Sequence, residues 1–68
     1  MSDHVYKIVE VVGSSETSVE DAITTAIARA SQTVRNLRWF EVASVRGEIQ
    51  NGRPYRYQAH LKIGFTME

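Results

Sequence analysis

The chain contains no cysteine, which excludes disulfides and thiolate metal sites. Its two histidines, His4 and His60, lie far apart in the sequence and show no metal-ligand spacing. Eight basic and eight acidic side chains leave no net charge, whereas a protein that binds nucleic acid through its phosphates normally carries a basic excess. We therefore expect no metal site and no nucleic-acid partner.

Long hydrophobic runs are also missing. Apolar residues occur only two or three at a time, whereas a helix that crosses a bilayer needs ~20 of them. The first three residues have neither the basic region nor the apolar stretch of a signal peptide. We therefore expect a cytoplasmic protein that makes no contact with a membrane.

The chain has only 68 residues, which leaves room for one domain, residues 1–68. A domain of this size would bury only about 60% of the surface that its unfolded form exposes. Small domains compensate with disulfides, a metal or association. Because the composition argues against the first two, we expect the chain to associate with copies of itself.

The first half of the chain reads as a strand followed by a helix. β-branched residues are frequent over 5–12, which predicts a strand that closes at residues 13–15. Thr17 and Glu20 form a Thr-x-x-Glu capping box at the head of a helix. Apolar side chains then recur with a period of about 3.6 residues. This stripe runs as far as Leu37 and consists of Ala22, Ile23, Ala26, Ile27, Ala30, Val34 and Leu37.

The second half reads as a hairpin of two strands, over 38–49 and 55–67. Asn51 and Gly52 favour a type I′ turn between them, and Pro54 fits only at the start of the second strand. This strand alternates cleanly between two faces. One face has Tyr55, Tyr57, Ala59, Leu61, Ile63 and Phe65; the other has Arg56, Gln58, His60 and Lys62.

These elements predict an α+β fold with the order β-α-β-β. The helix returns the chain, so the first two strands run the same way and the third lies antiparallel between them. The expected subunit is a three-stranded antiparallel sheet of order 1-3-2, curled around one helix. A single helix cannot cover both faces of the sheet, so the uncovered face is expected to meet partners.

Trp39 is the only tryptophan in the chain, and its place in the strand is informative. Strand alternation places it opposite Phe40 and Val42. If those two side chains meet the helix, the indole points away from the subunit core. The face of an indole can stack on a flat π-system.

Gln58 is expected to point the same way as Trp39. A hairpin that turns on residues 51–52 places Gln58 opposite the Val45 region, with Arg46 nearby unless a bulge at Gly47 changes its face. A carboxamide offers a donor and an acceptor side by side, and a guanidinium binds a phosphate or lies against a ring. The set suits a flat heteroaromatic ligand, but it also suits an interface in which Trp39 anchors a neighbouring subunit.

Several segments of the chain resemble the bacterial dodecins. The resemblance spans nearly the whole chain, in order and with little room for gaps. It is carried by RWFEVASVRG at 38–47, YQ at 57–58, KIGF at 62–65, YKIVEVVGSS at 6–15, and the helix residues ARA at 28–30 with Thr33.

The resemblance implies a hollow homododecamer with flavin sites on two-fold axes, each shared by two subunits. The Trp39 side chains of both subunits would sandwich a stacked pair of flavins, typically FMN, with riboflavin or FAD as alternatives. Gln58 would bind the polar edge of the ring and Arg46 would contact the flavin. Tyr6 and His4 would lie near the tail or phosphate.

Two positions depart from the family pattern. Arg38 stands beside the tryptophan where an acidic residue is common, which would alter the charge near the flavin. Some members also bind coenzyme A through basic residues on the helix and after the last strand's Gly-Phe. Arg29 and Thr33 fit that second site, but Thr66 stands where an arginine is expected, which puts coenzyme A binding in doubt.

The resemblance therefore implies flavin storage, sequestration and photoprotection rather than catalysis. An indole in contact with an excited flavin would return it to the ground state by electron transfer. We expect no catalytic residue, because neither histidine forms a recognisable dyad or triad. The alternatives are a cofactor-free oligomeric structural or interaction protein and a flavin-dependent redox enzyme. The latter needs an open position over the ring, which a stacked pair would occlude.

Overall fold

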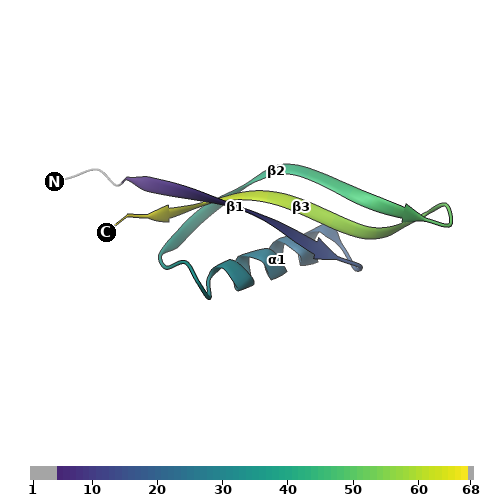
Figure 1. Ribbon diagram of the computed structural model, residues 1–68, viewed down its shortest axis with the longest axis horizontal. Coiled ribbons are helices and arrows are strands. Elements are labelled where there is room, and N and C mark those ends of the chain that lie inside the picture. Colours follow the sequence, from purple (N-terminus) through teal and green to yellow (C-terminus); the bar gives the residue numbers. More distant parts are fainter. Residues whose placement is uncertain (1–4, 68) are drawn as a thin grey trace.

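The computed structural model describes residues 5–67 and contains four elements (Figure 1). These are β1 (Tyr6–Ser15), α1 (Val19–Ala30), β2 (Leu37–Gln50) and β3 (Arg53–Thr66). The strands form one sheet of order β1-β3-β2, and both pairings are antiparallel. The predicted fold class, element order and strand order are all confirmed. His4 lies outside the described residues.

The helix begins one residue later than the predicted capping box implies. Ser18 is the N-cap, and its Oγ accepts a hydrogen bond from the Asp21 amide at 3.0 Å. Ser15 explains the shift: its Oγ accepts the Thr17 amide at 2.9 Å and donates to Oδ2 of Asp21 at 2.7 Å. Because these bonds hold Thr17 in the connecting loop, its pairing with Glu20 as a capping box was wrong.

The helix also ends earlier than its apolar stripe suggests. It stops at Ala30, whose carbonyl accepts the Val34 amide at 2.9 Å in the turn that follows. Asn36 then adopts a left-handed conformation with φ of 64°, which asparagine tolerates better than most residues. Leu37 therefore opens β2 and packs against the core from the sheet. The expectation that the helical stripe continues to Leu37 was wrong.

The core lies between α1 and the sheet. Three alanines of the helix face inward onto β3, as both the helical stripe and the strand alternation predicted. Small side chains allow a close approach: a Cβ atom added to Gly13 of β1 would lie 2.8 Å from Cβ of Ala26 and closer still to the Ala22 carbonyl oxygen. The buried apolar residues are Ala22, Ala26, Ala30, Ala59, Leu61 and Ile63.

The helix packs chiefly on β1 and β3 and leaves most of the same side of β2 uncovered. Phe40, Val42 and Val45 lie there with exposed fractions of 47%, 40% and 49%. The β2–β3 hairpin also projects beyond α1 (Figure 1). The radius of gyration is 14.2 Å, whereas about 11 Å is usual for a compact domain of this length. The subunit alone is thus elongated and leaves much apolar surface bare.

The hairpin turn has the predicted type I′ conformation, with φ of 56° at Asn51 and 74° at Gly52. Within the described residues, no helix is long and apolar enough to cross a membrane.

Candidate functional site

The face of the sheet opposite α1 brings the candidate residues together. Because Ala59, Leu61 and Ile63 are buried against the helix, the residues between them point to the other side. Their ladder partners on the neighbouring strands share this side. We call it the helix-free face; its residues are Tyr6, Ile8, Glu10 and Val12 of β1, Trp39, Glu41, Ser44 and Arg46 of β2, and Gln58, His60, Lys62 and Gly64 of β3.

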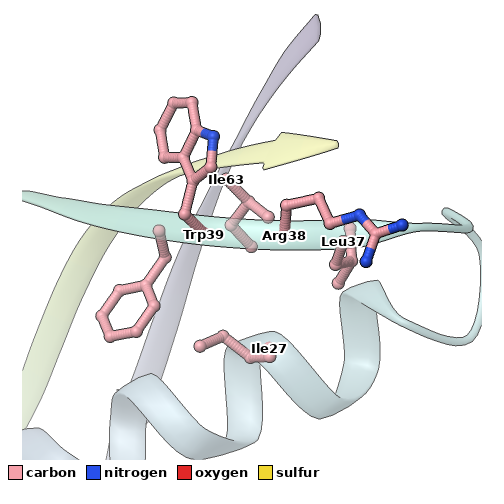
Figure 2. Close-up of a pocket in the computed structure, with 6 residues that line it drawn as sticks. Ile27, Leu37, Arg38, Trp39 and Ile63 are labelled. Atoms are coloured by element: carbon pink, nitrogen blue, oxygen red, sulfur yellow. The ribbon is translucent and has the colours of Figure 1, made fainter. Parts of the chain in front are cut away.

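Trp39 lies on this face, as strand alternation predicted. Figure 2 shows its indole on the side of β2 opposite Ile27 of the helix. Trp39 pairs with Gly64 in the ladder, and the Tyr6 ring makes a T-shaped contact with the indole, with ring centroids 6.1 Å apart and planes inclined by 65°. Trp39 as a whole remains 39% exposed. The result is an aromatic platform backed by the sheet and bordered by a second ring.

Arg46 and Gln58 form a second polar unit on the same face. They are direct ladder partners, and Nε of Arg46 donates to Oε1 of Gln58 at 2.8 Å. The prediction that Gln58 lies opposite the Val45 region is confirmed to within one residue, because its partner is Arg46. The register shifts between Glu48 and Ile49, closer to the turn than Gly47. The bond uses the amide oxygen, so the carboxamide NH2 group and the terminal guanidinium N–H groups still provide donors.

The structure does not bring Trp39 and Gln58 together within one chain. The partner of Trp39 is Gly64, six residues along β3 from Gln58. At about 3.3 Å per residue, this separates the two by about 20 Å. A ligand that contacts both an indole and an Arg46–Gln58 pair must take them from two copies of the chain.

A charged strip fills the space between these two units. Nε2 of His60 lies 2.7 Å from Oε1 of Glu10, and Lys62 is the ladder partner of both Glu10 and Glu41. The Glu10–His60 contact was missed from the sequence. The β1–β3 register would have revealed this contact. It places His60 opposite Val12, and Glu10 is the next residue of β1 on the same face, two positions before Val12.

The two positions that depart from the dodecin pattern are in contact with each other. Nε of Arg38 donates to Oγ1 of Thr66 at 3.1 Å. Thr66 also lines a hollow of about 480 Å³, which has two cations and no acidic side chain in its wall. Of the residues expected to bind coenzyme A, Thr33 and Thr66 meet in this hollow, whereas Arg29 is not part of its wall. The lining is Lys7, Thr33, Val34, Arg35, Asn36, Phe65, Thr66 and Met67.

A second hollow, of about 280 Å³, lies between α1 and the start of β2 (Figure 2). Its wall is almost entirely apolar, with Arg38 as the one charged member. The indole rises on the other side of β2, so this hollow is separate from the aromatic platform. The lining is Ile27, Leu37, Arg38, Trp39, Phe40 and Ile63.

Among residues 5–67, the pKa of Arg56 is shifted by its neighbours, away from the aromatic platform. The Tyr55 hydroxyl, which accepts a hydrogen bond from Arg56, raises the pKa of this guanidinium, and the Glu16 carboxylate at 2.9 Å adds to the effect. Arg56 thus joins the hairpin to the loop before α1 as a permanent cation. Within residues 5–67, no cluster of three or more His, Cys, Asp or Glu side chains could hold a metal ion.

Comparison with known proteins identifies the family. The dodecin family model matches residues 5–68. A curated dodecin from Thermus thermophilus is 50% identical over 64 residues, which are 94% of this chain and 93% of the relative. The calcium dodecin of Mycobacterium tuberculosis is 30% identical over 63 residues, with 93% and 89% covered.

Solved structures agree with the sequence relatives. The dodecin of Streptomyces coelicolor superimposes with a TM-score of 0.92 at 50% identity, and the match covers 100% of this chain and 97% of that one. A Thermus thermophilus structure gives a TM-score of 0.91 at 48% identity, with 97% of each chain covered. The fold, the strand order and the sequence all place the chain in one group: it belongs to the dodecin family.

Proposed function

We propose that this dodecin binds flavin and stores it in stacked pairs between the Trp39 side chains of two copies. The observation that carries the proposal is the platform itself: the only tryptophan lies on the helix-free face, backed by Gly64 and bordered by Tyr6, with its side chain still exposed. A rigid, exposed indole favours a flat aromatic ligand. FMN is the proposed ligand, with riboflavin and FAD as related forms.

The polar residues of the same face match a flavin ring. Gln58 and Arg46, joined by their 2.8 Å hydrogen bond, would supply donors to the pyrimidine edge of a ring stacked on the partner's indole. Arg38 adds a positive charge next to Trp39 and would attract the phosphate of FMN. Tyr6 lies at the edge of the platform and would contact the flavin tail. His4 is proposed for the same region on the family resemblance alone.

Self-association into a homododecamer is part of the proposal. The elongated shape, the uncovered helix side of β2 and the exposed hairpin all leave apolar surface that a partner copy would bury. A site shared across a two-fold axis also explains why Trp39 and the Arg46–Gln58 pair lie so far apart in one chain. We propose that the assembly works in the cytoplasm.

Photoprotection follows from the chemistry of the platform. An indole in van der Waals contact with an excited flavin donates an electron and receives it back, so that the excitation is lost before the flavin reacts. This step needs no general base and no nucleophile. We therefore propose a binding and protective role rather than an enzymatic one, in keeping with a family of small binding proteins.

An FMN titration of the apoprotein tests the proposal. Flavin emission should be quenched until one FMN is bound per chain. Stacking on an aromatic side chain contributes about 1–3 kcal/mol per ring, so Trp39→Ala should weaken binding by about fivefold to 150-fold and remove the quenching by electron transfer. A Trp39→Ala variant that binds and quenches FMN as well as the unsubstituted chain would defeat the electron-transfer account.

The competing role is a cofactor-free assembly in which Trp39 anchors the subunit interface. The 39% exposure of Trp39 in one subunit is compatible with such an anchor. The two functions predict different results in the same titration. The interface role is favoured if the purified protein is colourless and does not bind added FMN. It also predicts that Trp39→Ala dissociates the oligomer.

Coenzyme A is a second candidate ligand, favoured by the hollow at Thr66. Lys7 and Arg35 give its wall two positive charges, and the guanidinium of Arg38 hydrogen-bonds Thr66 where the family pattern has an arginine. We propose that Arg38 replaces part of the charge missing at position 66. Calorimetric titration with coenzyme A tests this, and an isotherm without binding heat would reject it.

A further inference from the structure

Gly64 lies directly beneath the Trp39 indole. The two residues are ladder partners of β3 and β2. A Cβ atom added to Gly64 would lie 2.8 Å from Cδ2 of Trp39 and closer still to Cε2 and Cζ2. All three atoms belong to the six-membered ring of the indole. This ring therefore occupies the space that a side chain at position 64 would fill.

The backbone itself does not require glycine here. Among the described glycines, only Gly52 has a positive φ, so alanine can adopt the conformation of Gly64 without strain. The other residues of the helix-free face on β3 all carry longer side chains, namely Gln58, His60 and Lys62. Gly64 is thus the one position along β3 where a ring from β2 can lie flat on the sheet.

A neighbouring ring contacts the indole in addition to the sheet beneath it. Tyr6, on the strand at the other side of β3, meets it in a T-shaped contact with centroids 6.1 Å apart. The six-membered ring therefore lies against Gly64, while Trp39 as a whole stays 39% exposed. The size of the side chain at position 64 therefore determines how far the indole lies above the sheet.

We propose that Gly64 is a positioning residue that sets the height of the indole above the sheet and thereby the width of the ligand slot. The inference rests on the proposed function, because the slot is the space between two Trp39 side chains. An alanine methyl would push the ring outward by roughly 1.5 Å to restore ordinary carbon–carbon contact. Because both indoles of a two-fold pair move, the slot narrows by roughly 3 Å, most of the ~3.5 Å that a stacked ring occupies.

The first test is FMN titration of Gly64→Ala, followed by flavin quenching and by the mass of the assembly. We expect binding to weaken by at least about tenfold while the oligomer keeps its mass. Gly47→Ala is the matched control: it makes the same change in β2, where the added Cβ would meet the Arg56 carbonyl oxygen at 3.1 Å and no atom of Trp39. Its affinity should stay within about twofold of the unsubstituted chain.

A double-mutant comparison separates positioning from a general effect on folding. A phenylalanine ring lacks the outer part of the indole, so most of its overlap with the added methyl disappears. In the Trp39→Phe background, Gly64→Ala should therefore change FMN affinity by less than about twofold. Equal losses in both backgrounds, or loss of assembly in both, would overturn the proposal, because either result assigns Gly64 a structural role.

The fluorescence of Trp39 gives a readout that needs no ligand. Since Trp39 is the only tryptophan, its quenching by acrylamide reports the exposure of this one ring. We expect Gly64→Ala to increase that quenching. Unchanged acrylamide quenching, or FMN binding by Gly64→Ala that equals that of the unsubstituted chain, overturns the positioning role alone. Failure of the unsubstituted chain to bind FMN instead overturns the proposed function, and the slot with it.

Discussion

Replacing Gly13 with alanine should force the helix away from the sheet. The added methyl carbon would lie 2.8 Å from Cβ of Ala26 and closer still to the Ala22 carbonyl oxygen. Because one of these atoms is backbone, no side-chain rotation relieves the overlap. Overpacking of this kind costs about 1–3 kcal/mol, and we expect the upper end, since all three buried alanines of α1 must shift together.

Thermal unfolding followed by circular dichroism measures this effect. A loss of about 3 kcal/mol corresponds to a fall in Tm of about 12–24 °C for a domain of this length, provided that variants are compared at one protein concentration. Ser14→Ala is the control, because Ser14 is the exposed neighbour on the same strand and should change stability by at most about 0.5 kcal/mol. A Gly13→Ala variant whose Tm equals that of the Ser14→Ala variant would refute the close contact between helix and sheet.

Two further predictions concern the core and the ligand. Leu61→Ala removes a fully buried side chain and should cost about 2–5 kcal/mol, measured by denaturant unfolding; a loss below about 1 kcal/mol would show that Leu61 is not the centre of the core. Arg38→Glu reverses the charge beside Trp39 and should weaken FMN binding by about fivefold or more while leaving riboflavin, which has no phosphate, nearly unchanged. Equal losses for both flavins in parallel titrations would show that Arg38 does not contact the phosphate.

Strand alternation and turn chemistry predicted most of the fold and the platform. The period of two in β3 placed Ala59 and Leu61 inward, and Asn51–Gly52 fixed the hairpin. From the same rule Trp39 was predicted to point away from the helix. These features depend only on the alternation of apolar and polar residues and on the turn residues, both of which can be read from the sequence.

Features that depend on a competing local bond or on register were predicted poorly. The capping box failed because Ser15 holds Thr17 outside the helix, which no pattern of polar residues reveals. The end of the helix was predicted too late, because Leu37 fits the helical spacing of apolar residues although it belongs to β2. The ladder partner of Gln58 could be predicted only as the Val45 region, because a shift near the turn moves the register by one residue.

Side-chain contacts between segments that are far apart in the sequence were not predicted at all. The Tyr6–Trp39 and Arg38–Thr66 contacts join segments whose alignment follows from the β1–β3 register and from an irregularity between Leu37 and Trp39. A shift of one residue in either would move these side chains to the other face. The family resemblance pointed to several of the same residues, but the way they meet required the three-dimensional structure.

The central claim is that each flavin takes its indole from one copy and its Arg46–Gln58 pair from another. Mixing subunits tests it most directly: Trp39→Ala and Gln58→Ala chains are unfolded together in equal amounts, reassembled and titrated with FMN. Random pairing across two-fold axes should restore about a quarter of the tight sites, because only mixed pairs hold one complete half-site. A mixture that binds no more FMN than the two variants assembled separately would contradict the account.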